Sequence, residues 1–130
     1  MRENQSISAK DGAYLYAEIS EKDFYYGLNK VAATCKRTEA DEVTYNLHVI
    51  IRFELERDYF AGKLTIDQMR DAWNDKYEEY LGVRPENDAE GIMQDVHWSG
   101  GMFGYFPSYA LGSAIAAQLL HYMEGAMPVK

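Results

Sequence analysis

Apolar side chains recur every three or four residues along most of this chain, which is the spacing that places them on one face of an α-helix. The pattern is strongest over residues 39–61 and 65–82, and it returns over residues 20–31 and 107–124. No stretch alternates convincingly with period two, so the sequence predicts a mainly α fold. The apolar positions of the longest predicted helix are Val43, Leu47, Ile50, Ile51, Leu55 and Tyr59.

Local signals mark where these helices begin and end. Thr38 is a typical N-cap residue, and the acidic residues after it suit the positive end of a helix dipole, so we expect the long helix to start at residue 39. Gly62 and Gly82 are natural C-terminal residues, and residues 65–68 form a capping-box sequence. The other predicted starts are Ser20, with Asp23 three residues on, Asp88 and Pro107.

Composition narrows the class of protein. The 130 residues are 47% hydrophobic, enough for one packed domain, which we take as residues 1–130. The net charge of −8 disfavours nucleic acid, because phosphate contacts need clusters of Lys and Arg. The single cysteine, Cys35, excludes an internal disulfide, and the apolar runs are too short to cross a membrane. We therefore expect a cytoplasmic protein.

The segment over residues 94–109 holds most of the chain's candidate chemistry. It contains Gln94, Asp95, His97, Tyr105 and Tyr109, with glycines between them that let the backbone turn sharply. One interpretation is a tight corner between helices, with aromatic rings filling the core. The other is a binding site in which the imidazole and phenol groups donate hydrogen bonds to a developing oxyanion.

A metal site is not recognisable in the sequence. None of the three histidines, His48, His97 and His121, is followed by Glu, so no HExxH motif is present. We expect His48 to be a structural residue and His121 to lie at the surface. Arg37 leaves two interpretations open: it is a solvated charge before a helix, or a guanidinium that binds a carboxylate in a two-pronged geometry.

Two ordered signatures carry a resemblance to a known family. Residues 91–98 match the pattern G-x-x-Q-D-x-H-W, and residues 37–41 match I-R-x-x-A-D after its first position, where Lys36 stands. Residues 51–56 and 104–112 are also similar. On these residues the chain resembles the thermostable carboxypeptidase family, also called carboxypeptidase Taq, over residues 23–118.

The resemblance implies a zinc-dependent metallocarboxypeptidase that releases C-terminal amino acids from peptides. It implies a helical fold related to neurolysin and angiotensin-converting enzyme, and a homodimer. The family's HExxH zinc ligands are absent here and are expected upstream of Met1. The chain then resembles the C-terminal part of the catalytic domain, truncated at both ends, which lines the substrate cleft and is inactive alone.

Roles for individual residues follow from the same resemblance. Tyr105 corresponds to a tyrosine that donates to the tetrahedral oxyanion, and His97 is expected beside the same oxygen. Arg37 is the candidate for the terminal carboxylate of the substrate, and Tyr109 is a second candidate phenol. Residues expected to orient His97 and the loop are Gln94 and Asp95.

Two other functions remain open at this point. A partial domain with uncovered apolar stripes is consistent with a non-catalytic helical module that self-associates. An independent hydrolase that uses Asp95 and His97 as acid and base is the third hypothesis.

Overall fold

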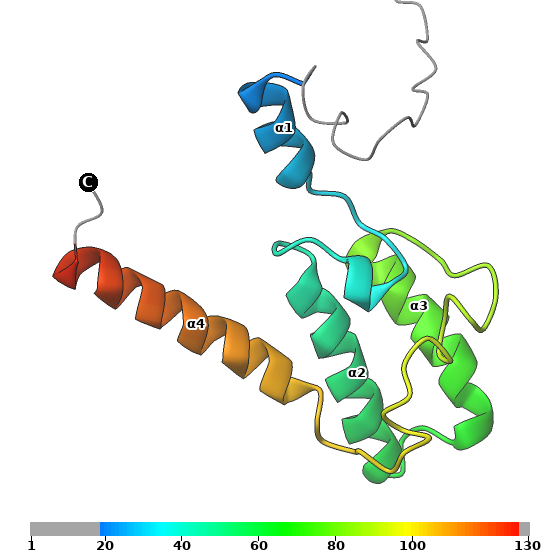
Figure 1. Ribbon diagram of the computed structural model, residues 1–130. Coiled ribbons are helices and arrows are strands. Elements are labelled where there is room, and N and C mark those ends of the chain that lie inside the picture. Colours follow the sequence, from blue (N-terminus) through cyan, green and yellow to red (C-terminus); the bar gives the residue numbers. More distant parts are fainter. Residues whose placement is uncertain (1–18, 128–130) are drawn as a thin grey trace, which may run out of the picture. The chain divides into compact units, whose positions relative to one another are not determined.

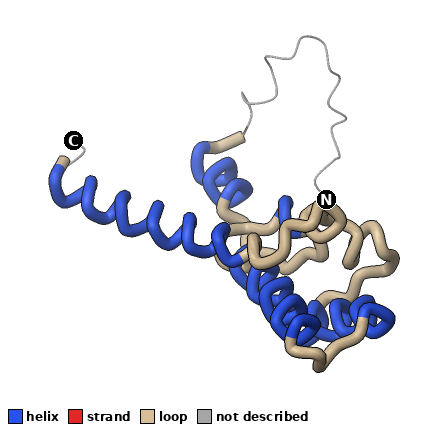
Figure 2. Tube along the Cα trace, turned by 90° about the horizontal axis from the view of Figure 1, so that it is seen from below, coloured by secondary structure: helices blue, strands red, loops and turns tan. Residues whose placement is uncertain are grey.

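The computed structural model describes residues 19–127, and within them every regular element is a helix (Figures 1 and 2). This confirms the predicted mainly α class. The elements in chain order are α1 (Glu21–Leu28), the 3-10 helix η1 (Arg37–Glu39), α2 (Tyr45–Phe60), the 3-10 helix η2 (Ile66–Gln68), α3 (Met69–Leu81) and α4 (Pro107–Ala126).

The chain divides into two compact units, Met1–Lys30 and Val31–Lys130. The described part of the first unit is α1, whose predicted cap is confirmed: Ser20 Oγ accepts a hydrogen bond from the amide of Asp23 at 3.1 Å. The helix ends at Leu28, three residues before the predicted end. The assignment of residues 1–130 to one domain stays a prediction.

The predicted start of the long helix at residue 39 is wrong. Residues 37–39 form η1 instead, and α2 begins at Tyr45. The cause is Asp41, whose Oδ1 accepts hydrogen bonds from the amides of Val43 at 3.0 Å and Thr44 at 2.9 Å. A side chain that bonds to the backbone just ahead of it stabilises a turn in competition with a helix. The predicted end is confirmed, because Gly62 has a φ of +70°.

The boundaries of α3 follow the local signals closely. The capping box is formed by Thr65 and Gln68, and it opens η2, from which α3 continues. Gly82 ends α3 in the left-handed conformation, with a φ of +67°. A predicted short helix starting at Asp88 is not formed. The Asp88 side chain instead accepts from Arg70 Nε at 2.6 Å.

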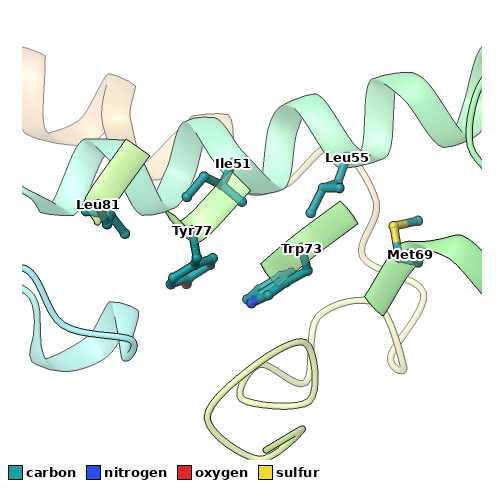
Figure 3. Packing of buried hydrophobic residues seen from close by; sticks show 6 residues of the cluster. All are labelled: Ile51, Leu55, Met69, Trp73, Tyr77 and Leu81. Carbon is teal, nitrogen blue, oxygen red and sulfur yellow. The ribbon is translucent and has the colours of Figure 1, made fainter. Parts of the chain in front are cut away.

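The hydrophobic core of the second unit lies between α2 and α3, which pack side by side (Figure 1). Figure 3 shows the side chains of the two helices facing one another. The buried cluster comprises Ile51, Leu55, Met69, Trp73, Tyr77 and Leu81. The Trp73 and Tyr77 rings stack at 5.1 Å between centroids. Two positions of the predicted α2 stripe, Val43 and Ile50, are exposed.

The last helix, α4, begins at Pro107 as predicted, but its residues are not part of the core. None of its residues is buried, and its predicted apolar stripe faces solvent. The exposed fractions along this stripe are 63% for Leu111, 55% for Ile115, 57% for Leu119 and 74% for Tyr122. Across residues 19–127, no helix is both long and apolar enough to span a membrane.

Candidate functional site

Arg37 lies in η1 and is buried, so its interpretation as a solvated charge is wrong. Its Nη2 donates to Asp95 Oδ1 at 2.7 Å, and its Nε lies 3.2 Å from the same oxygen. Its Nη1 donates to the Tyr45 hydroxyl at 3.0 Å. The guanidinium is therefore oriented from two sides, by Asp95 and by Tyr45.

Asp95 joins Arg37 to a second buried cation, Arg52 on α2. Arg52 Nε donates to Asp95 Oδ2 at 2.7 Å, and its Nη2 also lies 2.7 Å from that oxygen. Burial raises the pKa of Asp95, but the hydrogen bonds and charges of Arg37 and Arg52 outweigh burial and lower the pKa below its ordinary value. Burial likewise opposes the charge of Arg37, but Asp95 outweighs it and raises the pKa of Arg37.

Gln94 binds the backbone of Arg37 and of Cys35, two residues before it. Its Oε1 accepts from the amide of Arg37 at 2.9 Å, and its Nε2 donates to the carbonyl of Cys35 at 2.9 Å. The predicted orienting residues Gln94 and Asp95 thus both contact Arg37, and Asp95 contacts Arg52 as well. No hydrogen bond joins either of them to His97 within the described residues, and Asp95 Oδ1 is 3.9 Å from His97 Nδ1.

His97 is buried and held by aromatic groups. Its Nε2 is 3.0 Å from the hydroxyl of Tyr109. Its ring centroid lies 4.5 Å from that of Phe106, which is itself buried. The Tyr109 hydroxyl fixes one ring nitrogen of His97, and the orientation of the imidazole follows from that bond.

Tyr105 completes the group at its exposed side, with 46% of its surface accessible. Its ring centroid lies 5.5 Å from that of His97 and 5.4 Å from that of Tyr109. The Tyr109 ring also lies 5.0 Å from the guanidinium carbon of Arg37. The four side chains expected to touch substrate, Arg37, His97, Tyr105 and Tyr109, therefore adjoin one another. Burial, followed by Tyr105, raises the pKa of Tyr109.

The sequence interpretation did not include a line of buried polar residues on α2. His48, Arg52 and Glu56 are all buried and stand four residues apart, which places them on one face of the helix. This spacing was visible in the sequence. Arg52 Nη1 donates to the carbonyl of His48 at 2.8 Å and to the Tyr77 hydroxyl at 3.0 Å. The guanidinium carbon of Arg52 also lies 4.5 Å from the Trp73 ring centroid.

The surroundings of His48 agree with the structural role expected from the sequence. Its Nδ1 is 3.0 Å from the Tyr77 hydroxyl, and burial, aided by the charges of Arg52 and Arg37, lowers its pKa from 6.5 to about 4. His121 is exposed on α4, as expected. No group of three or more metal-ligating side chains converges anywhere in residues 19–127. The described residues therefore do not fit a metal centre of their own.

Comparisons with known proteins show the family to which the chain belongs. The family model described as carboxypeptidase Taq (M32) metallopeptidase matches residues 5–129. Carboxypeptidase 1 of Bacillus subtilis is 50% identical over 113 residues, covering 87% of this chain and 23% of its own length. Thermostable carboxypeptidase 1 of Thermus thermophilus is 47% identical over 110 residues, covering 85% of this chain and 22% of its own length.

A solved structure shows the same relationship in three dimensions. The M32 carboxypeptidase from Deinococcus radiodurans superposes with a TM-score of 0.80 at 46% identity, over 85% of this chain and 22% of that chain. The helical fold of this chain thus matches part of an M32 carboxypeptidase. The chain is a member of the carboxypeptidase Taq (M32) metallopeptidase family, and it spans less than a quarter of the length of the curated relatives it matches.

Proposed function

We propose that this chain forms the substrate-binding wall of a metallocarboxypeptidase, which releases single amino acids from the C-termini of peptides. The observation that carries the proposal is the contact series from Arg37 through Tyr109 and His97 to Tyr105. In this series the Arg37 guanidinium lies 5.0 Å from the Tyr109 ring, and His97 and Tyr105 lie beside that ring. Family membership supports this function over a non-catalytic self-associating module or an independent hydrolase.

Arg37 is the proposed receptor for the substrate's terminal carboxylate. A guanidinium has five N–H donors, and Asp95 and Tyr45 take up three of them, one each from Nε, Nη1 and Nη2. Within residues 19–127 no acceptor takes the other two N–H groups, which are the proposed donors to a second carboxylate. Asp95 is shared with Arg52, so its single charge does not offset both cations, but its hydrogen bonds hold Arg37 in place before a peptide binds.

His97 and Tyr105 are the proposed donors to the oxyanion that forms when the last peptide bond is attacked. Preorganised donors at such an oxygen lower the barrier because they need no rearrangement during the reaction. Tyr109 holds the His97 ring through its hydroxyl, and its own ring lies beside Arg37. Requiring a free carboxylate at Arg37 makes the enzyme an exopeptidase.

Other properties belong to the same proposal. The metal is zinc, and we assign its ligands to the part of the parent protein outside the described residues. The parent fold is related to neurolysin and angiotensin-converting enzyme, and the parent is a homodimer in the cytoplasm. The exposed apolar side chains of α4, Leu111, Ile115 and Leu119, support association, which light scattering of the purified protein tests.

A chimeric enzyme tests the catalytic proposal. In it, the part of this chain that aligns with Carboxypeptidase 1 from Bacillus subtilis over 113 residues replaces the corresponding segment of that enzyme. We expect it to cleave peptides with a free C-terminus and to leave C-terminal amides intact. Tyr105→Phe should lower kcat by about 100-fold with little change in KM. Tyr122→Phe, at an exposed position of α4, is the control. An unchanged kcat in Tyr105→Phe removes Tyr105 from catalysis.

A further inference from the structure

One buried carboxylate on α2 holds both sides of the glycine-rich loop that precedes Tyr105. Glu56 is 5% exposed. Its Oε1 accepts from the indole Nε1 of Trp98 at 2.5 Å, and its Oε2 accepts from the backbone amide of Gly104 at 2.8 Å. The two donors stand on either side of residues 99–103, so a single side chain joins the two ends of the loop.

Each donor adjoins a residue that the proposed function uses. Trp98 directly follows His97, and Gly104 directly precedes Tyr105. Gly104 has a φ of +72°, a left-handed conformation that turns the chain immediately before Tyr105. The carboxylate of Glu56 therefore fixes two points of the chain, each one residue away from a proposed oxyanion donor.

The loop's own hydrogen bonds do not extend to Tyr105. Within it, the amide of Met102 donates to the carbonyl of His97 at 2.8 Å, and the amide of Phe103 donates to that of Gly101 at 3.1 Å. The next amide, that of Gly104, donates to Glu56. The local turn thus closes through Phe103, and Glu56 supplies the hydrogen bond at the residue before Tyr105.

A side chain that only filled space in the core at position 56 would need no charge. Burying a carboxylate is unfavourable unless its oxygens are hydrogen-bonded, and here both oxygens accept from the loop. Trp98 already packs edge-on against Trp73, with 5.8 Å between centroids, and against Phe106 at 6.0 Å. Apolar contacts therefore hold the Trp98 ring. What the carboxylate adds is the direction of the indole N–H and the position of Gly104.

We propose that Glu56 is a positioning residue, which sets Tyr105 and His97 in register with one another. The inference rests on the proposed function, because it concerns the two donors of that reaction. Glu56 does not touch the substrate. It acts through Gly104 and Trp98, and loss of its two hydrogen bonds lets the Tyr105 ring move relative to the His97 ring.

Three variants separate this role from a contribution to folding alone. Glu56→Gln keeps the size of the side chain and one acceptor oxygen, but its amide nitrogen cannot accept from the second N–H. Trp98→Phe removes one donor and keeps an aromatic ring. Glu54→Gln is the matched control, because Glu54 stands on the same helix and bonds Lys76 and Tyr80 instead of the loop.

The first measurement is made on this chain by NMR. In Glu56→Gln, protection of the Gly104 amide from hydrogen exchange should fall by about 10-fold, and the Trp98 indole proton should shift. Glu54→Gln should leave both signals in place. If the Gly104 amide keeps its protection and the Trp98 indole proton does not shift in Glu56→Gln, neither hydrogen bond depends on the carboxylate and the inference is overturned.

The second measurement uses the chimeric enzyme, at a temperature where each variant is fully folded by circular dichroism. Glu56→Gln should lower kcat by about 10- to 100-fold while KM changes by less than about 3-fold, because misplaced donors weaken the transition state more than the ground state. Trp98→Phe should give a smaller loss of the same kind, and it serves as the test variant if Glu56→Gln does not fold.

The outcomes distinguish this inference from the proposed function. A normal kcat in Glu56→Gln, together with lost protection at Gly104, overturns the positioning role and leaves the carboxypeptidase proposal intact. An inactive unsubstituted chimera overturns the proposed function and the catalytic part of this inference. In that case the exchange of Gly104 still decides whether Glu56 anchors the loop.

Discussion

The guanidinium of Arg37 and the carboxylate of Asp95 face one another with Nη2 2.7 Å from Oδ1, although 58 residues separate them in the chain. Arg52 approaches the other oxygen of Asp95 from α2, also at 2.7 Å. One carboxylate, whose side chain is 9% exposed, therefore ties η1, α2 and the segment after α3 together. Both guanidinium groups are buried, so water could take over their hydrogen bonds to Asp95 only at a large cost in free energy.

Asp95→Asn should consequently destabilise the fold strongly. The amide is neutral and leaves two buried cations without a counter-charge, which we expect to lower the free energy of unfolding by about 3–5 kcal/mol. Urea unfolding followed by circular dichroism measures the loss. Asp75→Asn is the matched control, because Asp75 pairs with Arg84 at the surface and its loss should cost less than about 1 kcal/mol. Equal losses in the two variants would contradict this account of Asp95.

Tyr77→Phe tests the hydrogen bonds that join α3 to the polar face of α2. The Tyr77 hydroxyl accepts from Arg52 Nη1 at 3.0 Å and lies 3.0 Å from His48 Nδ1. Removing it leaves buried partners unsatisfied, so we expect a loss of about 1–3 kcal/mol in the free energy of unfolding. Thermal unfolding measures it. Tyr122→Phe, at a position that is 74% exposed, should change stability by less than about 0.5 kcal/mol.

The sequence predicted those parts of the fold that local signals determine. The capping box at Thr65 and the left-handed Gly82 bound α3 because each acts on its own neighbours. The start of α2 was not predicted correctly. Acidic residues after Thr38 suit the first turn of a helix as well as they suit the turn that is found there. The decisive contacts are those of the Asp41 side chain with two particular amides.

Which residues form the functional site stays a prediction, and the sequence did not predict the contacts that hold the candidate residues. The resemblance placed Arg37, His97, Tyr105 and Tyr109 in one site, and the structure brings them together. Their supports, Arg52 and Glu56, were not singled out from the sequence, because charged residues on a helix are ordinarily solvated. Asp95, the partner of Arg52, stands 43 residues away in the sequence, and Trp98, the partner of Glu56, stands 42 residues away. Periodicity carries no information over such separations.

Metal removal should have no effect on this chain alone. The described residues hold no cluster of three ligands, so we expect no stoichiometric zinc by elemental analysis and no peptidase activity. Adding a chelator should leave the thermal midpoint unchanged. The chimeric enzyme is the positive control, since its activity should be lost with the same chelator. Chelator-sensitive cleavage of peptides by the 130-residue chain would place a metal site within it and overturn this expectation.

The stability of the fold should depend on pH through His48, whose pKa is lowered from 6.5 to about 4, chiefly by burial. Above pH 6.5 the imidazole is neutral in both the folded and the unfolded chain, so it has no effect on the pH dependence. As the pH falls from 6.5 towards 4, the unfolded chain binds a proton that folded His48 does not. Stability therefore decreases, by about 3 kcal/mol in total at pH 4.

His48→Gln isolates this effect from the acidic groups that titrate below the same range. The variant lacks the ionisable ring, so the difference in unfolding free energy between wild type and variant should shrink as the pH is lowered from 7 to 4. His121→Gln, at an exposed position of α4, should follow the wild-type profile. Urea unfolding at several pH values provides the curves. Parallel profiles for wild type and His48→Gln would mean that folded His48 accepts a proton as readily as the unfolded chain does, and that its burial against Tyr77 does not keep it neutral.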